Sequence, residues 1–512
     1  MTAVDRLPLW ELAEWRAAES PDATLAVDER DRRITFGEYR DRCRRVAAAF
    51  AAMGIGRDTP VAWMLPTSIE SLVLAGALAR LGAVQVPLLP ALREREVRFI
   101  LEKTGAVRLF VPGTWRGFDY PHFAKCLTAD LPSVDVSVVD GDLPEADPAS
   151  LPPWASIGPV GDEDPIRWIF FTSGTTADPK GCLHTDRTVT ASGHRLNLRF
   201  AMTADDVYTL VFPVTHIGGI SLLIGALLVG YRHILVDVFH PEETCDVLSR
   251  NGVTIAGSGP AFWMAYVAYQ RRHPERRAFP RLRALVGGGA PKPAGLDEEV
   301  RDVLGVPLVS GYGMSECPGV AHCGVDDSPE AWRTDGHALD DSALAIVGPD
   351  GSFLDPGEQG EIVVRGPMTF LGYLDPVQNE GAFLDGWFRT GDLGTLDQAG
   401  FLKVTGRLKD IIIRKGENIS AKEVEDVLHL HPSIADAAAI ALPDAERGEL
   451  CCAVVVLADG LGDLTLGDVA DHCRDRRLSR QKTPERLEIV EVLPRSSTGK
   501  VLKQDLVARY AG

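Results

Sequence analysis

The sequence contains no apolar run long enough to cross a membrane and no recognisable leader at its start. The longest apolar stretch, Ile217–Gly230 (IGGISLLIGALLVG), is shorter than the roughly 20 residues that a spanning helix needs, and it is rich in glycine. We interpret this stretch as a buried helix. The N-terminal residues, MTAVDRLPLWELAEW, lack the basic-then-apolar pattern of a secretory signal. These absences predict a cytoplasmic protein without a membrane span.

Cysteine spacings typical of metal sites or redox motifs are also missing. Nine cysteines are scattered along the chain, and no Cys-x-x-Cys motif occurs. The adjacent residues Cys451 and Cys452 suit a buried strand better than a metal site. An odd, unpatterned set of cysteines in a long chain is typical of a reducing compartment.

Basic residues are outnumbered: 53 Lys and Arg stand against 72 Asp and Glu, which gives a formal net charge of −19. Nucleic acids and anionic membrane surfaces would be repelled on average, so we expect neither as a partner. A small anionic ligand is still compatible with this charge if basic groups converge locally. Lys180, Lys415 and Lys500, each next to a glycine, are candidates for such convergence.

The order of apolar patterns predicts an α/β fold. With 512 residues the chain is too long for one compact core, so two or more domains are expected. Strand-like runs alternate with helical patterns from about residue 34 to 310, which favours layered α/β sheets. Short strands separated by turns follow residue 340 and predict a β-rich subdomain. The last hundred residues then predict a small α+β domain, with a helix at Ser420–His429.

A hydroxyl-rich loop follows the strand predicted at Ile166–Phe171. The segment FFTSGTTADPKG, residues 170 to 181, combines hydroxyls, glycines and Lys180 in a few positions, as a cradle for phosphate oxygens requires. It is not a Walker loop, because Lys180 follows a proline and precedes Gly181 rather than Ser or Thr. Taken alone, such a loop is equally well an ordinary solvated turn.

A second candidate segment is Ser310–Glu316 (SGYGMSE). Its glycines permit close approach of a ligand, Tyr312 offers a ring for stacking, and Glu316 offers an oxygen ligand suited to magnesium. The alternative is a plain strand-to-helix turn capped by Ser315. The nucleophile elbow Gly-x-Ser-x-Gly is excluded because Cys317 stands where the second glycine would be, which argues against a hydrolase.

Three polar segments nearer the C-terminus complete the set: WFRTGD at 387–392, GRLKDIIIRKGENI at 406–419 and PRSSTGKVLK at 494–503. Asp392, in a predicted Thr-Gly-Asp turn, can accept both hydroxyls of a ribose, and Arg407 can donate to the same sugar. Lys500 lies in a polar loop, where a lysine is by default a solvated charge.

Together these segments resemble one family, the adenylate-forming superfamily of acyl-CoA synthetases, adenylation domains and luciferases. FTSGTTADPKG resembles the family's phosphate loop and YGMSE its Tyr-Gly-x-Thr-Glu motif, and the match keeps the family's order over nearly the whole chain. LVGGGAP, GEIVVRGPMTFLGYL, DGWFRTGDLG and PRSSTGK also fit. Ala177 replaces the usual Gly and Ser315 the usual Thr. Both keep the chemistry, since Ala is small and Ser retains the hydroxyl.

The resemblance implies activation of a carboxylic acid by ATP. The carboxylate attacks the α-phosphorus, giving an acyl-adenylate and pyrophosphate, and a thiol then displaces AMP. Fixed cations and hydrogen-bond donors around the phosphates are the main requirement of the first step. The implied cofactors are ATP, Mg²⁺ and coenzyme A, and the implied partner is a small-molecule acid.

The resemblance also implies a role for each motif residue. Glu316 would hold Mg²⁺, Ser315 would lie near the α-phosphate, and Lys500 would bridge this phosphate and the substrate carboxylate. Asp392 and Arg407 would hold the ribose. The adenine would contact Gly289, Ala290, Ser310, Gly311 and Tyr312. The β- and γ-phosphates would contact Thr172, Ser173, Gly174, Thr175, Thr176 and Lys180. The catalytic set so implied is Lys500, Glu316, Lys180 and His216.

For the second step, members of the family rotate a small C-terminal domain. The implied division is an N-terminal domain at 1–407 and a mobile C-terminal domain at 408–512, with Lys409 as the pivot. Lys415 and Gly416 would then line the pantetheine tunnel. Without the resemblance, a plain hairpin turn would be the preferred interpretation of Gly416.

The acid itself is only partly indicated. The segment PVTHIGGI carries His216 where relatives that activate amino acids usually carry an Asp, so an amino acid substrate would lack a counter-charge. Phe262, Trp263 and Met264 suggest an apolar acyl group, although each is equally well an ordinary core residue. We predict a medium-chain, branched or alicyclic acid, and PGTWRGFDY faintly resembles cyclohexanecarboxylate-type ligases. Aryl acids come next.

Two other functions stay open at this point. One is a stand-alone adenylation enzyme that loads a carrier protein. The other is an inactive nucleotide-binding protein, disfavoured because Lys180, Glu316, Asp392, Arg407 and Lys500 are all present. The quaternary state is expected to be monomer or homodimer.

Overall fold

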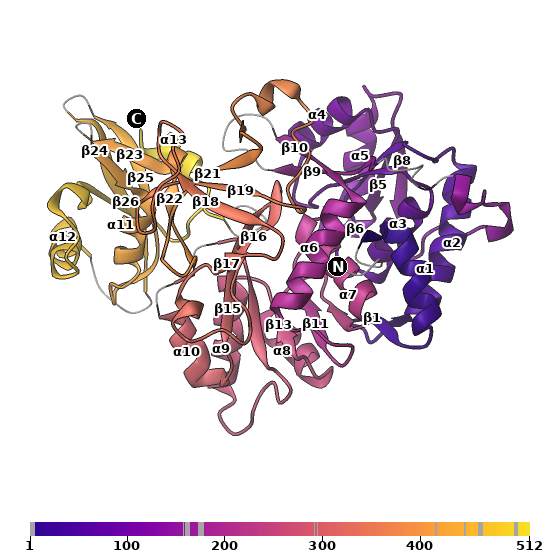
Figure 1. The fold of residues 1–512 in the computed structure, drawn as a ribbon, viewed down its shortest axis with the longest axis horizontal. Helices are drawn as coiled ribbons and strands as arrows, with labels where there is room; N and C mark the ends of the chain where they lie inside the picture. The colour runs from indigo at the N-terminus through magenta and orange to yellow at the C-terminus, as the bar shows by residue number, and fades with distance from the viewer. Residues whose placement is uncertain are drawn as a thin grey trace.

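A computed structural model describes residues 6–156, 158, 164–172, 179–290, 292–293, 295–414, 417–444, 447–458, 464–495 and 500–511. Two large sheets with helices packed between and around them form the first part of the chain. A smaller β-rich sheet follows, and a separate α+β unit ends the chain (Figure 1). The predicted fold class, α/β with a large N-terminal part and a smaller C-terminal part, is confirmed.

Sheet A has nine strands in the order β17-β16-β15-β14-β13-β11-β12-β1-β2. Its central strands are parallel, and the β15–β16 hairpin turns the chain at the edge. The strands are β1 (Thr24–Asp28), β2 (Arg33–Thr35), β11 (Val207–Leu210), β12 (Arg232–Leu235), β13 (Ile255–Ala256), β14 (Ala284–Gly288), β15 (Leu308–Met314), β16 (Cys317–His322) and β17 (His337–Ala338).

Sheet B has six strands in the order β10-β9-β4-β3-β5-β8. The strands are β3 (Pro60–Trp63), β4 (Val84–Pro87), β5 (Arg108–Pro112), β8 (Asp135–Val139), β9 (Ile166–Thr172) and β10 (Lys180–Thr185). β8 lies within residues 134–165, a stretch rich in Pro, Asp and Gly, and it was not predicted as a strand from the sequence. It pairs in parallel with β5 because its apolar residues, Val136 and Val139 among them, complete the edge of the sheet.

The helices between the sheets are largely buried. α3 (Ile69–Arg80) is buried along its whole length, and α7 (Ile217–Val229) is buried along nearly all of its length, as predicted for that stretch. α6 (Asp186–Arg199) packs tightly on α7 because Gly193 has no side chain; a Cβ there would lie 2.5 Å from the Ser221 carbonyl oxygen. The outer helices are α1 (Leu9–Glu19), α2 (Phe36–Ala52), α4 (Glu94–Thr104), α5 (Tyr120–Thr128), α8 (Pro241–Arg250), α9 (Pro260–Arg272) and α10 (Leu296–Leu304). Among the residues described, no helix is both long and apolar enough to cross a bilayer.

Sheet D carries the β-rich part of the chain in the order β18-β19-β21-β20, with β22 on β21. The strands are β18 (Ala343–Val347), β19 (Gly360–Arg365), β20 (Phe383–Leu384), β21 (Trp387–Leu396) and β22 (Leu402–Arg407). The Thr-Gly-Asp segment was predicted as a turn, but it lies inside β21. Gly391 takes a left-handed φ of +72°, and the β19–β21 register shifts there, so the strand continues through an irregularity.

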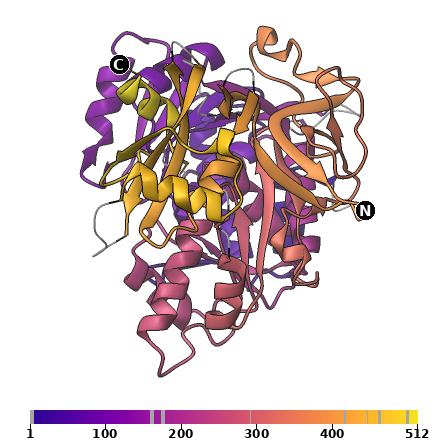
Figure 2. The same ribbon diagram turned by 90° about the vertical axis from the view of Figure 1, so that its left-hand side faces the viewer.

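Sheet E begins four residues after β22 and contains β23 (Ile411–Arg414), β24 (Glu417–Ser420), β25 (Ile434–Asp444), β26 (Gly448–Leu457) and β27 (Arg486–Ile489). Cys451 and Cys452 are buried in β26, as predicted. The helices of this part are α11 (Ala421–Leu428), α12 (Leu466–Asp475) and α13 (Lys503–Tyr510). Figure 2, in which this end of the molecule faces the viewer, shows helices lying over the sheet.

Three buried histidines make the fold sensitive to acid. Burial lowers the pKa of His184, His233 and His322 from an ordinary 6.5 to about 4. Below pH 6.5 the unfolded chain therefore binds protons that the folded chain refuses, and stability is lost as the pH falls from 6.5 towards 4. We expect a loss of about 2 kcal/mol per histidine between pH 7 and 5.

Denaturant unfolding at the two pH values measures this effect. His233→Gln should reduce the difference in the free energy of unfolding between pH 7 and pH 5 by about 2 kcal/mol, whatever its effect on absolute stability. An unchanged pH difference in this variant would contradict the assignment.

Candidate active site

The glycines at the ends of β14 and β15 create an open position at the edge of sheet A. Gly288 pairs with Gly311, and a Cβ on Gly288 would lie 2.2 Å from the Gly311 carbonyl oxygen, so only glycine fits. Gly289, with φ of +84°, is exposed, and a Cβ there would meet nothing within 4 Å. Ala290 is half-buried beside it. The strand ends therefore leave room for a flat group in the position predicted for adenine.

Tyr312, Asp392 and Arg407 meet at one carboxylate. The Tyr312 hydroxyl donates to Asp392 Oδ2 at 2.6 Å, and Arg407 Nε donates to Oδ1 at 2.7 Å. Asp392 and Arg407 face each other across β21 and β22, which explains why two residues fifteen positions apart form a pair. Asp392 is only 4% exposed, so its charge is held by these two donors.

Ser315 and Glu316 form the tight turn between β15 and β16. The Glu316 carboxylate is buried, and its Oε1 accepts a hydrogen bond of 2.8 Å from the Tyr373 hydroxyl. The Ser315 carbonyl accepts one of 2.8 Å from His184 Nε2. Since burial lowers the pKa of His184 to about 4, its ring is neutral at pH 7, and Nε2 carries the proton. The segment is thus a hairpin turn, and the alternative of a strand-to-helix turn was wrong.

Lys180 opens β10 directly opposite Thr172, the last residue of β9. Its ammonium lies 4.5 Å from the centre of the Tyr373 ring. Ser173, Gly174, Thr175 and Thr176, predicted to bind phosphate, lie outside the described residues, as do Lys415 and Gly416.

Lys500 reaches this group of residues from the far end of the chain. Burial and the Arg407 guanidinium lower its pKa, whereas Asp392 and Glu316 act in the opposite direction. Lys500 is accessible to solvent, and its charged neighbours are Arg407, Asp392 and Glu316. Its charge also adds to the burial that lowers the pKa of His216 to about 4. The tail lysine therefore lies close to residues of sheets A and D.

Comparison with known proteins agrees with this geometry. A sequence model described as "AMP-binding enzyme" matches residues 13–374, and a second, "AMP-binding enzyme C-terminal domain", matches 423–500. The chain belongs to the AMP-binding enzyme family. It is therefore an enzyme, of the acid–thiol ligase class, as the motifs predicted.

Three relatives in this family cover nearly the whole chain. The medium-chain fatty-acid–CoA ligase of Escherichia coli (strain K12) is 33% identical, over 96% of this chain and 89% of its own. The salicyl-AMP ligase / salicyl-S-ArCP synthetase of Mycobacterium tuberculosis (strain ATCC 25618 / H37Rv) is also 33% identical, over 95% and 88%. The solved o-succinylbenzoate CoA synthetase of Bacillus subtilis, in complex with its acyl-adenylate intermediate, superimposes with a TM-score of 0.84 at 28% identity, covering 98% of both chains.

His216, predicted at the acid-binding end of this AMP-binding enzyme, caps α7. Its Nδ1 accepts the backbone N–H of Gly218 at 3.1 Å, and its ring stands edge-on to Phe212 with centroids 6.2 Å apart. Phe212 was not among the predicted pocket residues. Trp263 is wholly buried in the core and Met264 is 47% exposed, so these two do not share a pocket wall.

Lys292 is a second residue that the family motifs did not reveal. Its ammonium donates to Ser310 Oγ at 3.1 Å and to the carbonyl of Trp332, and Ser310 in turn donates to the Thr334 carbonyl at 3.3 Å. Burial lowers the pKa of Lys292. These bonds tie the loop after β14 to β15.

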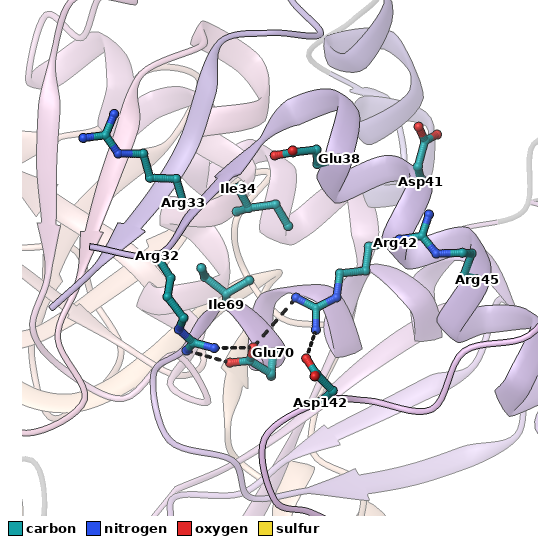
Figure 3. A pocket seen from close by; sticks show the side chains of 10 residues that line it. All are labelled: Arg32, Arg33, Ile34, Glu38, Asp41, Arg42, Arg45, Ile69, Glu70 and Asp142. Carbon is teal, nitrogen blue, oxygen red and sulfur yellow. Dashed lines mark hydrogen bonds and ion pairs between the residues drawn. The ribbon is translucent and has the colours of Figure 1, made fainter. Parts of the chain in front are cut away.

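A separate cavity of about 450 Å³ includes none of the predicted site residues (Figure 3). Its charged groups pair with one another: Arg32 with Glu70 at 3.0 Å, and Arg42 with Asp142 at 2.8 Å. The first pair attaches the turn between β1 and β2 to α3, and the second attaches the loop after β8 to α2. We assign the cavity a structural role.

Proposed function

We propose that the protein is an ATP-dependent carboxylic acid–CoA ligase that forms an acyl-adenylate and then an acyl-CoA thioester. The observation that carries this proposal is the position of Lys500, whose ammonium is within electrostatic reach of Glu316, Asp392, Arg407 and His216. Adenylate formation requires a cation near the groups that hold the metal, the ribose and the acid, which are here Glu316, Asp392 and the surroundings of His216.

The described residues fit a magnesium ion that arrives with ATP. Among them, no group of three or more His, Cys, Asp or Glu side chains can hold a metal by itself. Glu316 offers one carboxylate, and the Tyr373 bond to Oε1 leaves Oε2 for the ion. Mg²⁺ typically takes one or two carboxylates together with substrate phosphates and water. When bound, it would neutralise charge on the phosphates.

The residues divide the first step among them. The acid's oxygen forms a bond to the α-phosphorus while the bond to the pyrophosphate oxygen breaks, and the pyrophosphate leaves with its electron pair. Lys500 would stabilise negative charge between the carboxylate and the α-phosphate, and Lys180 the charge on the leaving group. Asp392 and Arg407 would hold the ribose. In the second step the CoA sulfur bonds to the acyl carbon and AMP leaves.

The acid is proposed to be apolar, of medium chain length, branched or alicyclic. Phe212 packs against His216, whose pKa is lowered to about 4 by burial and by the charge of Lys500, so its ring is neutral at pH 7. A neutral imidazole gives no counter-charge to a second carboxylate. A relative that is 33% identical acts on medium-chain fatty acids, which supports this class.

The second step is proposed to follow rotation of residues 408–512 about Lys409. Lys409 is exposed, between sheets D and E. A hydrogen bond crosses this junction close to Lys409: Ser420 Oγ donates to the Thr405 carbonyl at 2.6 Å. Ser420 also caps α11 by accepting from the Glu423 N–H at 3.3 Å. The bond to Thr405 stabilises the orientation that places Lys500 at the site.

Ser420→Ala should therefore slow adenylate formation by roughly three- to tenfold, the worth of one hydrogen bond, and leave thioester formation from supplied adenylate unchanged or faster. Ser420→Asp, which still accepts from Glu423 but cannot donate to Thr405, should behave like alanine. Ser420→Thr should behave like the parent enzyme. Equal slowing of both steps in the alanine variant would contradict this role.

Pyrophosphate release across a panel of acids, with and without CoA, tests the proposal. We expect continuous release with CoA and a medium-chain or alicyclic acid, and only a single turnover without CoA. Turnover with an acyl carrier protein but not with CoA would favour the carrier-loading function, and a relative is named as such an enzyme. Absence of pyrophosphate with every acid would reject adenylation.

A further inference from the structure

Tyr373 contacts two of the proposed catalytic groups, although it belongs to neither the phosphate loop nor the Tyr-Gly-Met-Ser-Glu turn. We propose that Tyr373 is a positioning residue shared by Lys180 and Glu316, an inference that rests on the proposed ATP site. Its hydroxyl donates to Glu316 Oε1 at 2.8 Å, and the face of its ring lies 4.5 Å from the Lys180 ammonium. The side chain is buried, with 7% of the residue exposed.

The backbone around Tyr373 is attached to β10 along its length. Leu183 N–H donates to the Gly372 carbonyl at 3.0 Å, and Leu374 N–H donates to the Gly181 carbonyl at 2.8 Å. On the other side, Tyr373 N–H donates to Asn379 Oδ1 at 2.7 Å. The segment therefore runs beside the strand that begins with Lys180, and backbone hydrogen bonds join the two.

The ring is also held from the side of Glu316. Phe370 packs edge-on against Tyr373 with ring centroids 4.8 Å apart. The N–H of the same Phe370 donates to the Glu316 carbonyl oxygen at 2.8 Å. Backbone and side chain of Glu316 are thus both bonded to the 370–373 segment. Such redundancy fixes the distance between the carboxylate and the lysine before any ligand binds.

The chemistry of a phenol suits this position. Lys180 and Glu316 carry opposite charges, and a direct ion pair would neutralise both groups that the phosphates and the metal require. A ring face attracts the ammonium without supplying a negative charge, and a hydroxyl orients one carboxylate oxygen while leaving the other available. Tyr373 can thus hold both groups in place and leave each reactive.

Two substitutions separate the two contacts. Tyr373→Phe keeps the ring and removes the hydroxyl, so the Mg²⁺ concentration that gives half-maximal ATP binding should rise about tenfold, with ATP affinity at saturating Mg²⁺ nearly unchanged. Tyr373→Leu removes the ring as well, and should in addition weaken ATP binding at saturating Mg²⁺ by roughly three- to tenfold. Calorimetric titration of ATP at several Mg²⁺ concentrations measures both quantities without turnover.

Tyr120→Phe is the matched control, because it removes another buried tyrosine hydroxyl. This hydroxyl donates to the Pro90 carbonyl at 2.7 Å, and Tyr120 packs in the core beside sheet B. It should lower stability and leave both titrations unchanged. An unaltered Mg²⁺ dependence in Tyr373→Phe, or equal ATP affinity in the Phe and Leu variants, would overturn the inference. Failure of the parent enzyme to bind ATP would instead reject the proposed function.

Discussion

Replacing Lys500 with alanine should lower the rate of acyl-adenylate formation by roughly 10²–10³ or more and leave thioester formation from supplied acyl-adenylate nearly unchanged. The reason is the environment of the ammonium. Protein groups surround it, Asp392 and Glu316 lie near it, and it perturbs His216 at the acid end. A cation at this point stabilises charge on the α-phosphate only while the phosphorus is attacked.

Separate assays of the two half-reactions measure this difference: pyrophosphate release without CoA, and CoA consumption with purified acyl-adenylate. Lys482→Ala is a suitable control, because it removes a lysine from the same C-terminal part of the chain. The Lys482 ammonium lies 2.6 Å from Glu423 Oε2, and both side chains of this ion pair are partly exposed to solvent. It should leave both assays unchanged because such surface pairs contribute little. Equal loss of both half-reactions in Lys500→Ala would show that the lysine is only structural.

The second large effect is expected at Asp392. Asp392→Ala should lower kcat/KM for ATP by roughly 10²–10³, because a ribose would lose two hydrogen bonds to a charged acceptor. The buried Tyr312 hydroxyl and the Arg407 guanidinium would also lose their common partner. Unlike Lys500→Ala, this variant should impair both half-reactions, since the AMP group is present in each.

Asp206→Ala separates this effect from a loss of stability. Asp206 is about as buried as Asp392, and its Oδ1 lies 2.9 Å from Arg283 Nε. It belongs to the loop before β11 and is not one of the predicted site residues. We expect it to lower the denaturation midpoint without changing KM for ATP. If Asp392→Ala also changes only the denaturation midpoint, the carboxylate does not bind ribose.

Much of the fold was predictable because apolar periodicity decides which segments are strands and helices. β9 agrees with its predicted range to within one residue, and the buried helix α7 lies within the predicted stretch Ile217–Gly230. The errors share a cause. β8 is a short run of valines within a stretch otherwise rich in Pro, Asp and Gly, and the Thr-Gly-Asp part of β21 contains a glycine in a left-handed conformation. In both places, pairing with a neighbouring strand accompanies the extended backbone.

The proximity of site residues was predictable where each belongs to a motif of the family. Asp392 and Arg407 were predicted to share a ribose, and the structure brings them to 2.7 Å. Tyr373, His184 and Lys292 were missed, because each acts through a contact with a residue at least eighteen positions away. No local spacing reveals such a contact. The roles of all these residues, and the division between 407 and 408, remain predictions.

The chemistry at the α-phosphorus can be tested most directly with an acid labelled with ¹⁸O in its carboxylate. Attack by the carboxylate on that phosphorus makes one labelled oxygen the bridge of the acyl-adenylate. When the thiol displaces AMP from the acyl carbon, this labelled oxygen stays on AMP. Mass spectrometry of the products should therefore find one ¹⁸O in AMP and none in pyrophosphate. Label in inorganic phosphate, with ADP as the second product, would contradict adenylation and the roles assigned to Lys500, Glu316 and Asp392.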